Sequence, residues 1–304
     1  MRQDEAQGTG TIFADFIAGT VWADVAAQSH EAKRSILNFF ATALGSANDP
    51  AVTAALRTLL PFSGAATSAV IGRPERLDAL ATRLTGDTGR SVEVIVADLN
   101  NKADLALVEQ RLRDDERITM LVNNAGITAS GPFVGADLDL FEKVIQLNAV
   151  AVMRLAGAAV PGFVARGRGT VINIGSVTAL MPETFNGTYS GTKAFVLNFT
   201  QALQAEVGER GIRVQAVLPG GTRTEIWERA GIDLSSYPPE MIMEVGEMVD
   251  AALAGLDQGE LVTMPSLPDA GEWEGFTAAR LALGPNLSRN HPADRYRPFD
   301  RQGL

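Results

Sequence analysis

The stretch VINIGSVTALMPETFNGTYSGTKAFVLNFTQAL, residues 171–203, places a serine, a tyrosine and a lysine at defined separations. Ser176 ends an apolar run that is typical of a buried strand, and Tyr189 and Lys193 lie four residues apart in a segment with helical spacing. Residues four apart share one helix face, and a lysine ammonium beside a phenol lowers the pKa of the phenol. Tyr189 can therefore protonate a carbonyl oxygen that Ser176 holds, although a tyrosine and a lysine at this spacing also form ordinary surface pairs.

Further motifs stand in order along the chain, each at the end of a strand-like run or inside a helix-like one. Asparagine and glycine tolerate turn conformations, so Asn-Asn-Ala-Gly alone indicates no more than a turn. Asn148 alone, within FEKVIQLNAVAVMRLAGAAV, is consistent with a hydrogen-bonded core amide. The specific signal is the whole set in order: Asp98-Leu99 after SVEVIVA, Asn123-Asn124-Ala125-Gly126 after ITMLV, Asn148, and Pro219-Gly220 with Thr222 and Thr224 after IRVQAVL.

This ordered set resembles the classical short-chain dehydrogenase/reductase (SDR) family, from about residue 73 to about residue 266. The resemblance implies hydride transfer between a nicotinamide cofactor, NAD(P), and a ketone/alcohol pair. It implies that Tyr189 protonates the forming alkoxide, that Ser176 holds the substrate oxygen, and that Lys193 lowers the pKa of Tyr189 and binds the nicotinamide ribose. Asn148 would position a water that relays protons to Lys193.

The resemblance also implies a set of cofactor contacts. At the end of the family's second strand, an acidic residue would hydrogen-bond the ribose 2′-hydroxyl of NAD and an arginine would accept the 2′-phosphate of NADP. Arg73 stands there, so NADP is the expected cofactor and NAD the alternative. The implied contacts are Arg73, Asp98, Leu99, Asn124, Ala125, Gly126, Tyr189, Lys193, Pro219, Gly220, Thr222 and Thr224.

From Ser68 onward, strand-like and helix-like runs alternate. This order predicts an α/β fold, a Rossmann-like parallel sheet with helices on both faces, and the Val/Ile-rich runs fit strands covered on both sides. We expect a helical N-terminal segment over residues 1–66, the Rossmann-like domain over 67–264 and a C-terminal tail over 265–304. The tail carries one short amphipathic helix with Trp273, Phe276, Leu281 and Leu283.

The chain lacks the strand and Gly-rich turn, usually TGxxxGIG, with which the SDR family begins. GTGT at residues 8–11 has two glycines but no strand before it. Residues from about 12 to about 80 instead resemble the N-terminus of the 2-methylcitrate dehydratase-like (MmgE/PrpD) family, through ADFIAGTVWAD, AKRSILNFFATALGSANDP and ATSAVIGRPERLDAL. A natural fusion, a mis-assembled gene and a laboratory chimera all fit this join, and a highly diverged dehydrogenase is the alternative.

The missing turn has consequences for the cofactor. Its glycines let the backbone approach the pyrophosphate, which sits on a helix N-terminus. We therefore expect an impaired oxidoreductase; a non-catalytic protein is the alternative, and a MmgE/PrpD-type lyase is a more distant one because that family's catalytic stretches are absent. The sheet would also lack its middle strand, which leaves two strand edges unpaired or draws TSAVIG into the gap.

Composition argues against several other functions. There is no Cys, and the two His residues, His30 and His291, are far apart, so we expect neither a disulfide nor a metal site. The net charge of −10 argues against nucleic acid and anionic membrane as partners. No apolar run reaches the about 18 residues of a membrane span and no signal peptide opens the chain, so we expect a cytoplasmic protein.

Residues 220–245 are expected to set the specificity for a small carbonyl or alcohol substrate. The apolar side chains there line a pocket in one interpretation and form ordinary packing in the other. SDR members commonly associate through the helices that correspond to those of Asn148 and Tyr189, which implies a homodimer or homotetramer. The apolar residues are Ile226, Trp227, Tyr237, Met241, Ile242 and Met243, and the expected helix EMIMEVGEMVDAALAGL overlaps the end of this set.

Overall fold

The computed structural model describes residues 67–72, 81–83, 85–86, 89, 91–129 and 131–296, with the backbone alone at 67–72, 228 and 229. The expected helical segment over residues 1–66 lies outside the described residues, and so does Arg73. The chain divides into two compact units, Met1–Pro265 and Ser266–Leu304, and each is described by itself.

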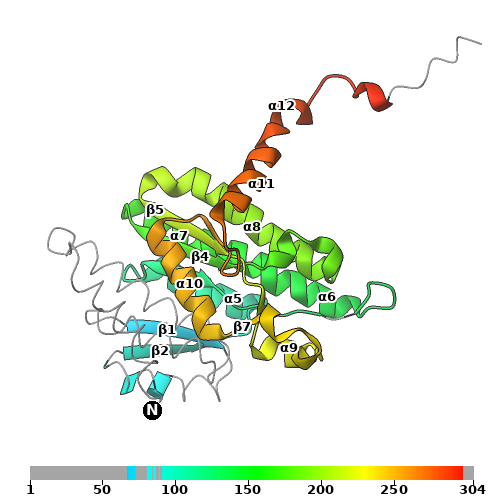
Figure 1. Cartoon of the computed structure of the whole chain (residues 1–304). Helices are drawn as coiled ribbons and strands as arrows, with labels where there is room; N and C mark the ends of the chain where they lie inside the picture. The colour runs from blue at the N-terminus through cyan, green and yellow to red at the C-terminus, as the bar shows by residue number, and fades with distance from the viewer. Residues whose placement is uncertain are drawn as a thin grey trace, which may run out of the picture. The chain divides into compact units, whose positions relative to one another are not determined.

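The strands pair in parallel throughout the described residues, as the alternation of strand-like and helix-like runs predicts. Four strands form a sheet of order β3-β4-β5-β8, and β1 pairs with β2 in a second group. Figure 1 shows β1 and β2 side by side. Most side chains of β3, β4 and β5 are buried, as expected for strands covered on both faces. The strands are β1 (Thr67–Gly72), β2 (Ser91–Val96), β3 (Met120–Asn123), β4 (Gly169–Ile174), β5 (Ile212–Val217) and β8 (Val262–Thr263).

The two groups of strands do not pair with each other. In the described part of the chain, β3 pairs with β4 and no strand pairs with its other edge. The run TSAVIG, which is β1, pairs with β2 along its whole length, from Thr67↔Ser91 to Gly72↔Val96. The expectation that TSAVIG moves into the gap beside β3 is therefore wrong, because β1 keeps its parallel partner β2.

Helices cover both faces of the β3-β4-β5-β8 sheet, as predicted. Alternate residues of a strand point to opposite faces, and side chains of β5 contact helices on each face of the sheet. Val214 joins the hydrophobic cluster that contains residues of α7 and α8, whereas the side chain of Gln215 donates to the carbonyl oxygen of Ala252 in α10 at 2.9 Å. The long helices of this unit are α5 (Lys102–Asp114), α6 (Leu138–Ile145), α7 (Val152–Ala165), α8 (Gly187–Val207) and α10 (Val245–Gln258).

An asparagine cap fixes the start of α8. The Asn186 side chain accepts hydrogen bonds from the backbone N–H groups of Thr188 at 2.9 Å and Tyr189 at 3.2 Å. Such a cap satisfies N–H groups that have no partner within the helix, and Asn101 caps α5 in the same way. As a result, Tyr189 lies in the first turn of α8 and Lys193 lies about one turn later.

The segment EMIMEVGEMVDAALAGL is helical only in its second part. Its first residues form the 3₁₀ turn η7 (Pro239–Met241) and the strand β7 (Ile242–Met243), and α10 begins at Val245. β7 pairs in parallel with β6 (Gly221–Thr222), about twenty residues earlier. The expectation of one continuous helix is wrong because this tertiary pairing holds two of the apolar residues in extended conformation.

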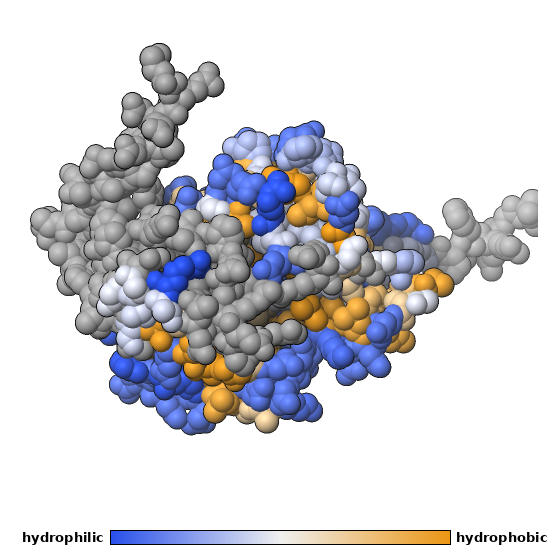
Figure 2. All heavy atoms as spheres, turned by 90° about the horizontal axis from the view of Figure 1, so that it is seen from below, coloured by the Kyte–Doolittle hydropathy of each residue, from blue (hydrophilic) through white to orange (hydrophobic). Residues whose placement is uncertain are grey.

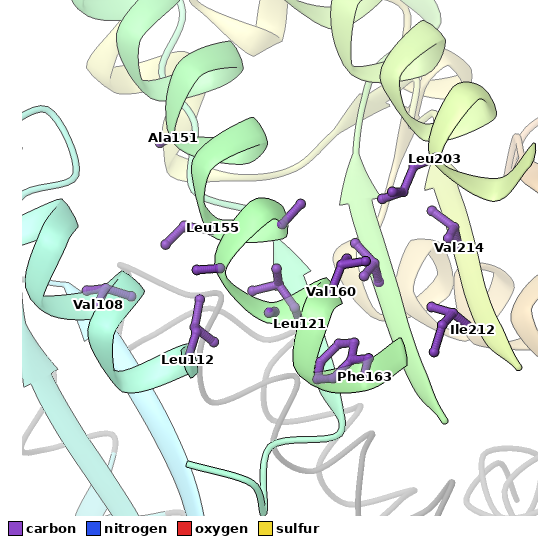
Figure 3. Close-up of a cluster of buried hydrophobic side chains, with 14 of the residues drawn as sticks. Val108, Leu112, Leu121, Ala151, Leu155, Val160, Phe163, Leu203, Ile212 and Val214 are labelled. Atoms are coloured by element: carbon purple, nitrogen blue, oxygen red, sulfur yellow. The ribbon is translucent and has the colours of Figure 1, made fainter. Parts of the chain in front are cut away.

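The main hydrophobic core lies between α5, α7, α8 and the strands (Figure 3). Phe163 of α7 is fully buried, and a Cβ at Gly169 would lie 2.4 Å from its Cγ, so the glycine makes room for the ring. Burial of a side chain of this kind stabilises a fold by about 1.5–3 kcal/mol. Figure 3 labels Val108, Leu112, Leu121, Ala151, Leu155, Val160, Phe163, Leu203, Ile212 and Val214.

One described stretch, Leu138–Ala165, is long and apolar enough to cross a membrane by length and composition. Within its most apolar window, 56% is buried inside the fold, where α7 contributes to the core. Burial in the core accounts for the apolar character of this run. The protein surface mixes hydrophilic and hydrophobic residues (Figure 2), and the loop before α6 exposes Phe133 and Val134.

Candidate active site

Ser176 and Tyr189 come from different elements, and their side chains share a hydrogen bond. Ser176 lies just beyond β4, where its Oγ accepts from the Thr178 N–H at 3.2 Å and caps the 3₁₀ turn η3 (Val177–Ala179). Tyr189 reaches the same place from the first turn of α8. The pair therefore lies at the carboxyl end of a parallel strand, which is where open α/β sheets place their functional groups.

Burial raises the pKa of Tyr189 to about 12, and the hydrogen bond with Ser176 opposes only part of this rise. The ring packs edge-on against Phe185, with ring centroids 5.3 Å apart. The Lys193 ammonium lies 5.6 Å from the centre of the tyrosine ring. The expectation of a lowered pKa for Tyr189 is wrong for this structure: the net shift is upward, because desolvation outweighs the hydrogen bond with Ser176. A phenol with a raised pKa keeps its proton at neutral pH, so Tyr189 carries a transferable proton but is a weaker acid than an ordinary tyrosine.

Lys193 is a buried cation between α8 and the end of β4. Its side chain is almost completely covered, and Nζ donates a hydrogen bond to the carbonyl oxygen of Ile174 at 2.9 Å. Burial lowers the pKa of Lys193 to about 8. Because an ammonium carries three donors, the bond to Ile174 leaves capacity for further acceptors. Lys193 is thus a donor whose proton is released only slightly above neutral pH.

Asn148 lies in a π-helical turn, η2 (Gln146–Ala151), between α6 and α7. Its Nδ2 donates to the carbonyl oxygen of Ile127 at 2.8 Å, and its Oδ1 accepts from the N–H of the same residue at 3.0 Å. Nδ2 also donates to Thr192 Oγ1 at 3.3 Å. Single π turns inside helices frequently mark functional sites. Here the turn lets one amide connect the loop after β3 with α8.

Gly126 brings the side chains of Asn148 and Lys193 together. A Cβ at this position would lie 3.3 Å from Asn148 Oδ1 and 3.7 Å from Lys193 Nζ. The first of these distances is tighter than most real Cβ contacts, so a larger residue would displace the amide. The fold therefore gathers the last residue of Asn-Asn-Ala-Gly, the buried amide and the buried lysine in one place.

Three residues that the sequence assigns to the cofactor line a small hollow with room for about one water molecule. Leu99, Asn124 and Ala125 contribute to its wall, together with apolar residues of α5 and α7. Asn123 also lines it: its Nδ2 donates to Asn173 Oδ1 at 2.8 Å, while its own buried Oδ1 has no partner. An unpaired buried acceptor costs free energy, so a hydrogen-bond donor in this cavity would be stabilised.

The Asp98 side chain is engaged within its own turn. Its Oδ1 accepts from the Asn100 N–H at 3.0 Å, and its backbone N–H donates to Asp104 Oδ2 at 2.8 Å. These bonds fix the turn between β2 and α5 and hold Asp98 exposed beside the buried Leu99. Among the described residues, no group of three or more His, Asp or Glu side chains is placed to hold a metal ion.

The segment after β5 lies next to Ser176. The carbonyl oxygen of Pro219 accepts from the Val177 N–H at 3.0 Å, which joins the ends of β4 and β5. Beyond it, Thr222 Oγ1 donates to the carbonyl oxygen of Gly220 at 3.2 Å, and Thr222 is buried. Thr224 Oγ1 donates weakly to the Thr222 carbonyl oxygen at 3.5 Å. The structure thus places these predicted cofactor residues at the same edge of the sheet as the serine.

Trp227 anchors the segment that was expected to set specificity. Its Nε1 donates to the Thr222 carbonyl oxygen at 2.7 Å, and its ring lies 6.0 Å from that of Tyr237. An exposed ion pair, Arg223 with Glu244 at 2.7 Å, joins the two ends of the segment. Trp227 therefore has a packing role, with α9 (Glu225–Arg229) and the β6-β7 pair forming one small folded lobe.

Sequence reasoning did not select several residues that shape the site. Thr192 Oγ1 donates to the Tyr189 carbonyl oxygen at 2.7 Å while it accepts from Asn148. Asn186 Nδ2 donates to the Gly131 carbonyl oxygen at 3.1 Å, which ties the start of α8 to the loop before α6. Thr192 precedes Lys193 and lies three residues after Tyr189, so its place on the same helix face could have been inferred from spacing.

Comparison with known proteins agrees with this arrangement. A sequence model of the family described as short chain dehydrogenase matches residues 54–234. The chain is 36% identical over 152 residues to a very-long-chain 3-oxoacyl-CoA reductase of Anas platyrhynchos, covering 48% of each chain. It is 32% identical over 162 residues to a 2,5-dichloro-2,5-cyclohexadiene-1,4-diol dehydrogenase of Sphingobium indicum, covering 51% of this chain and 65% of the relative. The chain thus spans about half to two thirds of these relatives.

Solved structures match over a longer range. A short-chain dehydrogenase from Sphingobium yanoikuyae in complex with NADPH is 49% identical with a TM-score of 0.74, over 76% of this chain and 90% of that one. A bulky-bulky ketone specific alcohol dehydrogenase from Comamonas testosteroni is 42% identical with a TM-score of 0.70, over 77% and 89% of the two chains. With the family match spanning more than half of its length, this chain belongs to the short chain dehydrogenase family.

Proposed function

We propose that this chain is an NADP-dependent oxidoreductase that interconverts a ketone and the corresponding alcohol. The observation that carries the proposal is the hydrogen-bonded pair of Ser176 and Tyr189 with Lys193 one helical turn beyond. Two hydroxyls that share a hydrogen bond can both turn toward one carbonyl oxygen of a substrate. Two similar structures support the reaction class, since one is an NADPH complex and the other is described as specific for ketones.

The described residues fit part of a nicotinamide cofactor. We assign the adenosine end to the surface beside Leu99, Asn124 and Ala125, where a small hollow has a largely apolar wall and Asn123 brings an unpaired acceptor to it. We assign the nicotinamide ribose to Lys193, whose ammonium has donors beyond its bond to Ile174. Pro219, Gly220, Thr222 and Thr224 are assigned to the nicotinamide, and Arg73 to the 2′-phosphate. When bound, the cofactor supplies or accepts the hydride.

The chain's own residues move the proton. In the reductive direction the Tyr189 hydroxyl donates its proton to the substrate oxygen, and the raised pKa keeps that proton in place at neutral pH. Ser176 donates a hydrogen bond to the same oxygen. The nearby Lys193 ammonium stabilises the phenolate that remains. A water held near Asn148 would then return a proton by way of Lys193, whose pKa of about 8 suits a relay.

We also propose that weak cofactor binding limits the activity. A helix N-terminus after a central strand would donate hydrogen bonds to the pyrophosphate, and in the described residues no strand pairs with the outer edge of β3. Charge-assisted hydrogen bonds contribute about 1.5–3 kcal/mol each. Since 1.4 kcal/mol is a factor of ten, loss of two of them weakens binding by about 10²- to 10⁴-fold. A non-catalytic protein is the second candidate, and the same unpaired edge favours it.

Thermal unfolding with added nucleotide separates these candidates. A ligand at about 100 times its Kd stabilises the folded state by about 2.7 kcal/mol. We expect millimolar NADPH to raise the unfolding temperature and micromolar NADPH to leave it unchanged, with NADH as the control for the NADP assignment. An unfolding temperature that no concentration of NADPH or NADH changes would contradict the proposed oxidoreductase and favour the non-catalytic protein.

Association through α7 and α8 belongs to the same proposal. Both helices expose apolar side chains: Met153 on α7, and Phe195 on α8, which stacks on Phe199 with ring centroids 5.8 Å apart. Exposed aromatic and Met side chains are enriched at protein interfaces. We therefore propose a homodimer or homotetramer in which α7 and α8 of two copies pack together.

A further inference from the structure

Thr192 carries a buried hydroxyl that joins two parts of the candidate active site. The residue is 4% exposed and lies in α8 between Tyr189 and Lys193. Its Oγ1 donates to the carbonyl oxygen of Tyr189 at 2.7 Å and accepts from Asn148 Nδ2 at 3.3 Å. A hydroxyl has one proton to donate, so the bond to the Tyr189 backbone leaves a lone pair of Thr192 for the amide.

The amide of Asn148 continues this path into the loop after β3. Its Nδ2 also donates to the carbonyl oxygen of Ile127, and its Oδ1 accepts from the N–H of the same residue. The Thr192 hydroxyl thus completes a path of hydrogen bonds from the backbone of Tyr189 to the backbone of Ile127. The Tyr189 ring packs against a cluster that contains Ala129, two residues further along the same loop. The position of the ring therefore depends on how this loop is held against α8.

The same helix carries a second threonine with the same kind of bonding in a different place. Thr200 is fully buried, donates to the carbonyl oxygen of Val196 at 2.7 Å and accepts from Asn173 Nδ2 at 2.9 Å. Bonds from a threonine to its own helix are common, so this pattern alone indicates packing. Thr192 differs in what it holds, because its amide partner belongs to the π turn η2, whereas that of Thr200 belongs to β4.

We infer that Thr192 is a positioning residue that holds the Tyr189 hydroxyl in its reactive place, an inference that rests on the proposed ketone reduction. Thr192 is not itself a catalytic residue, because its hydroxyl is buried and both donates to and accepts from groups of the protein. Without this hydroxyl, α8 can shift against the loop after β3, and Tyr189 then moves relative to Ser176. A misplacement of about 1 Å can cost about 100-fold in rate.

Valine in place of threonine removes the hydroxyl and keeps the shape of the side chain. We expect Thr192→Val to lower the rate of NADPH-linked ketone reduction by about 10- to 100-fold, and Thr192→Ser, which keeps the hydroxyl, to retain most of the rate. Thr200→Val is the matched control: it should lower the urea midpoint of unfolding, as Thr192→Val does, and leave the rate unchanged. A Thr192→Val variant with the full rate, or equal losses of rate in the two valine variants, would overturn the inference.

NMR of the tyrosine side chains tests the positioning without any need for activity. The chain has three tyrosines, so labelling with ¹³Cζ-tyrosine gives few signals, and Tyr189→Phe identifies the signal of Tyr189. We expect Thr192→Val to shift or broaden this signal, and Thr192→Ser and Thr200→Val to leave it in place. The absence of any rate in the unmodified chain would contradict the proposed oxidoreductase. An unchanged Tyr189 signal in Thr192→Val would refute the positioning role, whatever the rate.

Discussion

Tyr189 combines a buried hydroxyl with a ring held by its neighbours, so its chemistry can be removed without disturbing its packing. Tyr189→Phe keeps the edge-on contact with Phe185 and loses only the proton donor. We expect NADPH-linked ketone reduction to fall by about 10²- to 10⁴-fold, the usual contribution of a general acid. The stabilisation by NADPH in thermal unfolding should persist. A variant that retains the full rate would show that the proton comes from another group.

Lys193 is predicted to cost stability when it is charged. The unfolded side chain keeps its proton up to a pKa of 10.5, whereas the buried one loses it near pH 8. Between these values the unfolded state binds more protons, so the contribution of Lys193 to stability rises with pH. Below pH 8 the charged lysine destabilises the fold by its full amount, and this destabilisation vanishes toward pH 10.5.

Lys193→Met should therefore stabilise the fold at pH 7, by about 1–3 kcal/mol, and abolish turnover. The gain should shrink when unfolding is measured at pH 9.5, because the wild-type lysine is then largely neutral in the folded state. Urea unfolding of both proteins at the two pH values gives the comparison. Equal differences in the free energy of unfolding at both pH values would contradict the assigned pKa.

At the scale of elements, the π turn η2 connects the loop after β3 to α8 through one side chain. Asn148→Ala removes the partners of both the N–H and the carbonyl oxygen of Ile127. Leaving partly buried polar groups unpaired costs about 1–3 kcal/mol, and we expect that loss in urea unfolding. Asn198→Ala, at an exposed position of α8, is the control and should change stability by less than about 0.5 kcal/mol. Equal effects of the two substitutions would contradict the connecting role.

Motif spacing predicted which strands and helices carry the candidate site residues, because parallel strands bring their carboxyl ends to one edge whatever their exact bounds. The π turn at Asn148 was not foreseeable, since the apolar spacing of residues 138–165 fits one uninterrupted helix. Ile242 and Met243 have helical spacing as well, yet pairing with Gly221 and Thr222 makes them a strand. Such pairings depend on tertiary contacts that a local pattern does not contain.

The pKa shifts of Tyr189 and Lys193 could not be predicted from the sequence either. The four-residue spacing of Tyr189 and Lys193 predicts that the cation lowers the pKa of the phenol, but it carries no information about burial. In the folded chain, desolvation raises the pKa of Tyr189 and lowers that of Lys193. Both shifts disfavour the charged form of a buried group. The sequence thus located the pair correctly and misjudged the dominant influence on its proton affinity.

At the scale of the whole molecule, the family match begins at residue 54, earlier than the motifs alone suggest, and it includes every assigned cofactor residue. The structure still leaves β3 without a described partner on one edge. These observations are consistent with our proposal that the catalytic groups are assembled and that cofactor binding is weak. The catalytic residues and the cofactor-binding residues can therefore be tested separately in one kinetic experiment.

The most direct measurement is the initial rate of ketone reduction as a function of NADPH concentration, beside the Sphingobium yanoikuyae dehydrogenase as a reference. We predict a measurable rate that reaches half-saturation at about 10²- to 10⁴-fold more NADPH than the reference requires, in proportion to the lost hydrogen bonds. Half-saturation at the same NADPH concentration as the reference would contradict the weakened cofactor site. The absence of any rate at saturating ketone and the highest attainable NADPH concentration would contradict the intact catalytic site.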